Sequence, residues 1–257
     1  MDKYTKMHSI EKNSFAKIWP EMYNHKTREQ KAKRIIKTLQ HFLQQKNLKS
    51  YKVLDVGCST GIIDNYLANY FDKITGLDSD ENAVLFAKKT FIHHNLNFKV
   101  GDALNLPFSN KSFDIVICAH IYEHVPNAKK MFDEIHRVLK PGGICYLAAI
   151  NKFWPIEPHY FLPFLSFLPQ NIADFYIRLM GKNNIYDVQS KSFWEIKKIT
   201  SKFNFIDYTE KIISDPKNFA YENISSFKSP FKYLINLFLP FFKIFSPTFF
   251  CLLIKNK

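Results

Sequence analysis

A short apolar strand, an acidic residue and a loop bounded by glycines constrain this chain more than any other feature. Residues 52–61 read K-V-L-D-V-G-C-S-T-G, and a helical pattern starts at Ile62. Gly57 and Gly61 let the backbone approach a ligand closely, because neither carries a side chain. The following helix N-terminus offers unpaired N–H groups to a polar or anionic ligand. The stretch therefore predicts a nucleotide-type binding loop between a strand and a helix.

The acids that follow this loop indicate which nucleotide it binds. The spacing differs from the dinucleotide fingerprint G-x-G-x-x-G, because Gly57 and Gly61 stand four positions apart with Ser59 between them. A second short strand ends in Asp78, 21 positions after Gly57, where a carboxylate can accept both hydroxyls of a ribose. Asp102 follows a third strand, where it can accept the amino group of an adenine.

Two more segments complete an ordered series. They read S-F-D-I-V-I-C over residues 112–118 and R-V-L-K-P-G-G over residues 137–143. Over roughly residues 50 to 150 the series resembles the class I S-adenosylmethionine-dependent methyltransferases, particularly the methyltransferase-11 type, although Ser59 stands where the family has a third glycine. The resemblance implies methyl transfer with S-adenosylmethionine as cofactor. It also implies the cofactor-binding residues, which are Asp55, Gly57, Gly61, Asp78, Asp102, Ala103 and His120.

The alternation of apolar strands and amphipathic helices predicts a parallel sheet with helices on both faces. After the strand that precedes Gly57, we expect strands near 73–77, 97–100, 113–118 and 144–150. Helices are expected at 27–45, 62–71, 80–93 and from Pro126. A helix over 193–203 and strands over 205–213 and 248–255 would complete a Rossmann-like, seven-stranded, mostly parallel sheet.

Length and charge indicate one elaborated domain in three parts. Residues 1–50 are an N-terminal arm and helix, residues 51–150 the cofactor-binding core, and residues 151–257 a lid insertion, the completing strands and a Phe-rich cap. Their net charges are +8, −1 and +6. Basic flanks suit an anionic partner, such as a phospholipid surface, an acidic substrate or RNA. A lysine-rich composition without such a partner is the alternative.

A proline-rich lid follows the fifth strand. Four prolines fall within residues 155–169, which argues against a long regular element, and the aromatic residues around them need burial. Glu157 and His159 flank Pro158, which restricts the backbone on both sides. A carboxylate near an imidazole holds its tautomer and raises its basicity, so we expect His159 as a general base that Glu157 orients. A purely structural role in the lid is the alternative.

The loop after the fourth strand supplies the remaining candidates. Glu123 and His124 precede Pro126 and resemble the family's Glu-His pair at this place. His124 is a further catalytic candidate, and the alternative is that the pair fixes the loop. His120 is expected to touch the cofactor rather than to act as the base.

Cysteine spacing and missing motifs limit the other possibilities. The four cysteines form no C-x-x-C pair, which indicates reduced core thiols and neither a zinc site nor a disulfide framework, so no metal site is expected. Reduced thiols and the lack of an apolar leader after Met1 indicate a cytoplasmic protein. The D/N-P-P-Y/F/W motif that would resemble the nucleic-acid enzymes that methylate amino groups is missing from the sequence. A nucleic acid is therefore not expected as a partner.

The C-terminal third leaves the acceptor open. Ser229–Ser246 holds a ten-residue uncharged run that Pro240 interrupts, whereas a bilayer span needs about twenty residues. It predicts either a cap packed on the lid or an interfacial segment at the inner face of the membrane. The expected function is O-methylation of a small molecule or of a glycan- or lipid-linked intermediate. The alternatives are a membrane-associated lipid or quinone methyltransferase and a non-catalytic cofactor-binding partner subunit.

Overall fold

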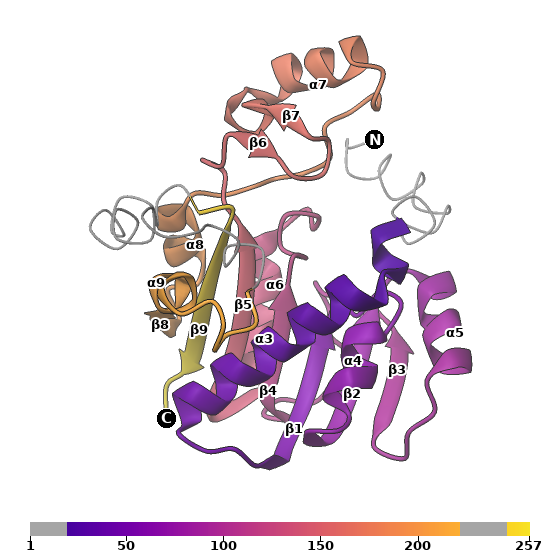
Figure 1. The fold of residues 1–257 in the computed structure, drawn as a ribbon, viewed down its shortest axis with the longest axis vertical. Helices are drawn as coiled ribbons and strands as arrows, with labels where there is room; N and C mark the ends of the chain where they lie inside the picture. The colour runs from indigo at the N-terminus through magenta and orange to yellow at the C-terminus, as the bar shows by residue number, and fades with distance from the viewer. Residues whose placement is uncertain (1–19, 222–245) are drawn as a thin grey trace.

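The computed structural model describes residues 20–221 and 246–257, which fold around a seven-stranded sheet (Figure 1). Its strands are β1 (Leu48–Val56), β2 (Phe71–Asp78), β3 (Leu96–Val100), β4 (Phe113–Ala119), β5 (Leu139–Ile150), β8 (Phe203–Asp207) and β9 (Thr248–Lys255). They lie in the order β3-β2-β1-β4-β5-β9-β8. The first five strands run parallel, and β9 runs antiparallel to β5 and β8. The predicted Rossmann-like, mostly parallel sheet is confirmed.

Helices alternate with these strands. They are η1 (Pro20–Tyr23), α3 (His25–Leu43), α4 (Ile62–Leu67), α5 (Glu81–Thr90), α6 (Ala128–Val138), α7 (Gln170–Leu179), α8 (Phe193–Ile199) and α9 (Thr209–Ser214), with a short η2 (Leu165–Phe167). Several of these helices have a polar side chain as N-cap. Asp80 accepts the backbone N–H groups of Asn82 and Ala83 at the start of α5, which satisfies two of the donors that an N-terminus leaves unpaired.

Three expected elements differ from the structure. The helix that begins at Ile62 stops at Leu67 instead of 71, because Phe71 is fully buried and opens β2. The expected strand over 205–213 is wrong: β8 ends at Asp207, whose carboxylate accepts the N–H of Thr209 as α9 begins. β5 starts at residue 139 instead of 144, with a shift of register against β4 across the Pro-Gly-Gly turn.

The helices predicted at 27–45, 80–93 and 193–203 all form, with boundaries that differ by at most four residues. One such shift follows from backbone geometry. α3 ends at Leu43 because Gln44 adopts a left-handed conformation with φ of 52°. A left-handed residue is a common way to end a helix.

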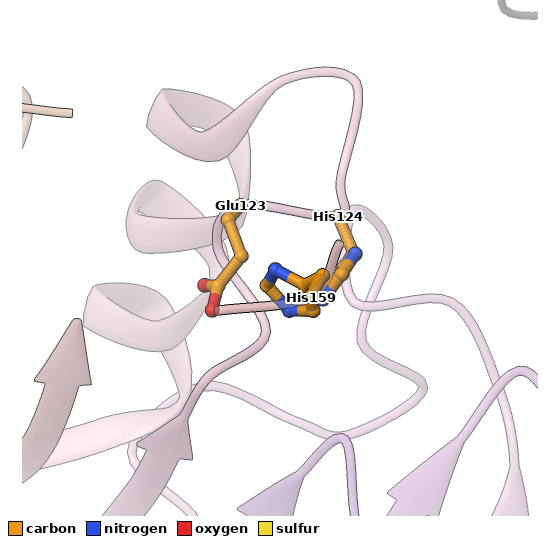
Figure 2. Close-up of side chains that lie close together, drawn as sticks. All are labelled: Glu123, His124 and His159. Atoms are coloured by element: carbon orange, nitrogen blue, oxygen red, sulfur yellow. The ribbon is translucent and has the colours of Figure 1, made fainter. Parts of the chain in front are cut away.

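The lid follows β5 and forms a small layer beyond the carboxyl edge of the sheet (Figure 1). It contains the two-stranded ribbon of β6 (Ile156–Glu157) and β7 (Leu162–Pro163), then η2 and α7. The expectation that the prolines exclude a long element within residues 155–169 is confirmed, and α7 starts directly after Pro169. A proline there precedes the helix and removes none of its hydrogen bonds. The lid brings His159 beside Glu123 and His124 (Figure 2).

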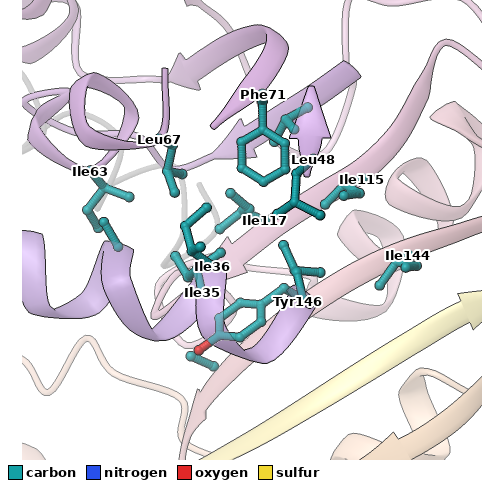
Figure 3. Close-up of a cluster of buried hydrophobic side chains, with 14 of the residues drawn as sticks. Ile35, Ile36, Leu48, Ile63, Leu67, Phe71, Ile115, Ile117, Ile144 and Tyr146 are labelled. Atoms are coloured by element: carbon teal, nitrogen blue, oxygen red, sulfur yellow. The ribbon is translucent and has the colours of Figure 1, made fainter. Parts of the chain in front are cut away.

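Two apolar layers hold the sheet. On one face Ile35 and Ile36 of α3 pack with Ile63 of α4 against Ile115 and Tyr146 of the sheet (Figure 3). α3 therefore buries its apolar side against the sheet. On the other face α6 and α8 cover β4, β5 and β9. The four cysteines are buried and free, as expected.

Some expectations lie outside the described residues. They are the N-terminal arm up to residue 19 and the Phe-rich segment over 229–246, of which only Ser246 is described. Among the helices that the structure does describe, none combines the length and the apolar character needed to cross a bilayer.

Candidate active site

The loop between β1 and α4 has the backbone geometry that its glycines predict. Gly57 and Gly61 have φ of 83° and 74°, in the left-handed region. A Cβ on Gly61 would lie 2.6 Å from the ring of Phe98, so no larger residue fits without displacement. Ser59 occupies the same region with φ of 50°, which glycine would adopt more easily. The serine is therefore accommodated at a conformational cost of about 1–2 kcal/mol.

Three carboxylates follow the carboxyl ends of neighbouring strands. Asp55 is 3% exposed in β1, Asp78 is half-buried at the end of β2, and Asp102 is exposed after β3. Asp78 joins the strands to the loop, because its oxygens accept the backbone N–H groups of Ser59 at 2.7 Å and Asp80 at 2.9 Å. A carboxylate oxygen has two lone pairs, so these bonds leave acceptor capacity for a ribose.

The charges of these acids depend on burial. Burial raises the pKa of Asp55 to about 7, which nearby Asp78 strengthens and the Arg28 guanidinium opposes. Burial also raises the pKa of Asp78, against the hydrogen bonds that it accepts from the backbone. Asp102 accepts the N–H of Leu104 at 2.7 Å, with half-buried Ala103 beside it. These residues fit the adenosine part of the expected cofactor, because hydrogen-bond acceptors and a loop bounded by glycines lie on one edge of the sheet.

Sequence reasoning missed two charged residues of this half. Arg28, in the first turn of α3, is close enough to Asp55 and Asp78 that both carboxylates raise its pKa against the lowering effect of burial. Asp64 of α4 is fully buried, and neither of its oxygens has a hydrogen bond among the described residues. A signal for Arg28 was present: α3 has no acid in its first turn, although the helix dipole favours one there.

The loop after β4 supplies His120, Glu123 and His124. His120 has φ of 59°, an uncommon conformation for a residue other than glycine, and its Nδ1 lies 3.8 Å from Oε1 of Glu123. Burial lowers the pKa of His120 well below its usual value and that of His124 to about 3. Glu123 is fully buried, and neither carboxylate oxygen has a hydrogen bond to a described residue. Burial raises the pKa of Glu123 to about 7 against the charge of His159.

The lid supplies the predicted pair. Nδ1 of His159 lies 2.7 Å from Oε1 of fully buried Glu157. Oε2 of the same carboxylate accepts the backbone N–H groups of His159 at 2.8 Å and Tyr160 at 2.7 Å. Burial alone would lower the pKa of His159, but the hydrogen bond and charge of Glu157 outweigh it and raise the pKa. The lid thus holds one imidazole with a fixed orientation and raised basicity.

Lid and sheet are joined by buried hydrogen bonds. The hydroxyl of fully buried Tyr122 donates to the carbonyl of Ile150 at 2.6 Å and accepts the N–H of Lys191 at 2.9 Å. The N–H of Gln189 donates to the carbonyl of Glu123 at 2.8 Å. The two ends of the lid are therefore tied to the loop after β4.

The sequence-predicted residues consequently form two adjacent groups. The cofactor group holds Asp55, Gly57, Gly61, Asp78, Asp102 and Ala103, and the imidazole group holds His120, His124, Glu157 and His159. The rings of His124 and His159 are 4.8 Å apart. The groups meet at Ile121, whose side chain would lie 3.0 Å from a Cβ on Gly57. The binding and catalytic roles of these residues stay predictions.

Residues 54–147 match the family model described as a methyltransferase domain. Among curated relatives, the ubiquinone biosynthesis O-methyltransferase of Coxiella burnetii is 34% identical over 44% of this chain and 50% of its own length. That of Pelagibacter ubique is 27% identical over 70% and 77% of the two chains. This chain thus spans about half the length of the Coxiella relative.

Solved structures support the fold. The S-adenosylmethionine-dependent methyltransferase from Mesorhizobium loti has a TM-score of 0.55 at 11% identity, covering 81% of this chain and 93% of that chain. At this identity the likeness concerns the fold alone. The family match, the strand order and the glycine loop agree with one another. Residues 54–147 therefore match a methyltransferase domain, within a fold that this chain shares with S-adenosylmethionine-dependent methyltransferases.

Proposed function

We propose that this protein methylates a hydroxyl oxygen of a small molecule or of a glycan- or lipid-linked intermediate. The observation that carries the proposal is the Glu157–His159 pair, held at 2.7 Å on the lid, with His159 beside Glu123 and His124 of the loop after β4. Ubiquinone biosynthesis O-methyltransferases among the relatives support oxygen as the target atom. Because a hydroxyl must lose its proton when it is methylated, a base at this place suits the chemistry.

Each group of residues has a separate task in this proposal. S-adenosylmethionine, when bound, supplies an electrophilic methyl group. Asp78 and Asp102 hold the adenosine part, and the loop from Gly57 to Gly61 leaves room for the rest. His159 accepts the proton of the acceptor hydroxyl, and Glu157 stabilises the imidazolium that results. Tyr122 holds the two ends of the lid together where they join the sheet.

The direct test incubates the protein with labelled cofactor in a host extract and identifies the methylated products by mass spectrometry. His159→Asn should lower turnover by about 10²–10⁴ while leaving cofactor affinity intact. Glu157→Gln should lower turnover less, because it perturbs orientation without removing the base. His94→Asn, on an exposed histidine past the end of α5, is the matched control and should retain activity. Cofactor binding with no product in any extract would instead favour a non-catalytic partner subunit.

One observation favours a membrane-associated acceptor as a second candidate. The lid exposes large apolar side chains, among them Phe161, Phe175 and Leu179 at 74%, 61% and 71%. Exposed Arg178 and Lys182 lie in the same segment, and the whole chain carries a net charge of +13. Apolar anchors with adjacent cations suit an anionic lipid surface. In this variant of the proposal the protein is cytoplasmic and binds the inner face of the membrane peripherally.

Flotation with anionic liposomes tests this variant. The protein should float at low salt and partly dissociate at high salt, because headgroup attraction is screened. The double change Phe175→Asp and Leu179→Asp should abolish flotation. Ile92→Asp, on a side chain that is 86% exposed in the cofactor half, should not. Failure to float in any lipid composition would contradict membrane contact and leave the soluble acceptor.

A further inference from the structure

A carboxylate and two imidazoles converge between the loop after β4 and the lid. Glu123, His124 and His159 each offer one ligand atom, and these atoms all lie within 4.8 Å of one another. Figure 2 shows the three side chains turned toward a common point, two from one loop and the third from the lid. Two histidines, one glutamate and an open fourth position are the ligand set of catalytic zinc sites.

Glu123 has the environment of a ligand without its ion. It is completely buried, and its oxygens have no hydrogen bond among the described residues. Nδ1 of His120 lies 3.8 Å from its Oε1, beyond hydrogen-bond distance. A buried carboxyl group without partners is unfavourable, because it loses its hydration. A cation beside it would compensate for that loss.

His159 has the second contact that metal-binding histidines make. Its Nδ1 lies 2.7 Å from Oε1 of Glu157, so an ion would bind through Nε2. A histidine ligand usually bonds to a carboxylate or carbonyl through its other nitrogen, which fixes the ring and raises its basicity. Glu157 is itself fixed by two backbone N–H groups. Glu157 therefore orients His159 toward Glu123 and His124 as a supporting carboxylate orients a histidine ligand.

Two features limit the affinity. Tetrahedral ligands at about 2.1 Å from zinc lie about 3.4 Å apart, so the side chains must close by roughly 1 Å. Half-buried Lys31 of α3 lies near enough to Glu123 to respond to its charge, and a second cation there would be repelled. We expect binding weaker than at a structural zinc site.

We propose that Glu123, His124 and His159 bind a divalent cation of the zinc class, with Glu157 orienting His159. The use of this ion rests on the proposed function. The acceptor hydroxyl would occupy the fourth position, where the ion lowers its pKa so that its proton leaves to solvent. The oxygen then bonds to the methyl carbon, and the carbon–sulfur bond breaks with its electron pair left on sulfur. His159 in this case holds the ion rather than the proton.

The test is calorimetric titration of ZnCl₂ into chelator-treated full-length protein, without cofactor or acceptor. One equivalent should bind. Glu123→Gln and His159→Asn should each lower the affinity by at least about 100-fold, and Glu157→Gln by about 10–100-fold. His94→Asn is the matched control and should leave the affinity unchanged. With Co²⁺ in place of zinc, tetrahedral absorption bands should appear in wild type and disappear in Glu123→Gln.

The outcomes separate this proposal from the methyl-transfer proposal. No stoichiometric binding of Zn²⁺ or Co²⁺, or binding that both ligand variants retain, would overturn the metal site. Methyl transfer at full rate in metal-free protein, lost in His159→Asn, would also overturn it and leave His159 as the base. Binding that depends on Glu123 and His159 in a protein with no methyl transfer would support the site and contradict the function.

Discussion

The two halves of the candidate site lie on one sheet edge but are assembled differently. The cofactor half comes from loops after β1, β2 and β3, and its acids are held by backbone N–H groups nearby, as Asp78 is by Ser59 and Asp80. The imidazole half joins segments 35 positions apart, because His124 follows β4 and His159 belongs to the lid. Its groups are also more deeply buried, with Glu123 and Glu157 both at 0% exposure.

This difference shows where specificity resides. A cofactor common to a whole family needs a loop of defined backbone shape, which a short contiguous motif can encode. An acceptor differs from enzyme to enzyme, so its site is built from an insertion that can change without altering the sheet. Changes in the first half should therefore act on stability and cofactor affinity, and changes in the second on turnover and acceptor choice.

The largest expected effect comes from breaking the loop of the cofactor half. In Gly61→Ala the new Cβ would lie 2.6 Å from Phe98 at a φ of 74°. Left-handed strain of about 1–2 kcal/mol and overpacking of about 1–3 kcal/mol should together lower the free energy of unfolding by about 2–5 kcal/mol. Urea denaturation measures this. Gly181→Ala, with φ of 63° and no atom within 4 Å, is the matched control and should lose only the strain. Equal losses would contradict the packing argument.

A smaller effect, in the pH dependence of stability, should distinguish the buried acids of the same half. Burial, together with the charge of Asp55, raises the pKa of Asp64 well above its usual value, and burial raises that of Asp55 to about 7. Between pH 4 and 7 the folded state then holds more protons than the unfolded state, so stability falls as pH rises through this window. About three pKa units in Asp55 correspond to up to about 4 kcal/mol.

Asp64→Asn should flatten this fall, because it removes one of the two carboxyl groups whose pKa is raised by burial in the folded state. Asp78 and Arg28, the other charged groups near Asp55, are left in place, so the difference between variant and wild type isolates Asp64. Urea denaturation at pH 5, 6, 7 and 8 provides the measurement. If the free energy of unfolding depends on pH in the same way in the variant as in wild type, Asp64 does not have a raised pKa in the folded state.

The smallest effect should separate the two halves by ligand affinity. Asp78→Ala removes the carboxylate expected to hold the ribose hydroxyls, and charge-assisted hydrogen bonds of this kind are worth about 1.5–3 kcal/mol each. Calorimetry with S-adenosylhomocysteine should show at least about a tenfold loss of affinity, or about 1.4 kcal/mol. Glu157→Gln should leave that affinity unchanged. If the lid variant weakens binding as much as Asp78→Ala in folded protein, the division into halves is wrong.

The parts of the fold predicted from sequence are those in which local chemistry decides. The glycine loop, the helix that follows Asp80 and the strand over 248–255 follow from short patterns whose physical requirements are local. The incorrect boundaries lie where tertiary packing decides. Phe71 belongs to β2 and not to the preceding helix because it pairs with Leu48 and is fully buried there. Nothing in the ten residues around it specifies that partner.

The same division holds for the site. The sequence alone determined that acidic residues and a loop bounded by glycines would meet at one edge of the sheet, since parallel strands bring their carboxyl ends together. It also indicated that Pro158 would hold Glu157 and His159 in a limited relation. Only the tertiary structure placed His159 beside Glu123 and His124, and Arg28 beside Asp55. The reason is that a lid 35 residues away and a helix before the sheet are positioned by packing, on which local sequence patterns carry no information.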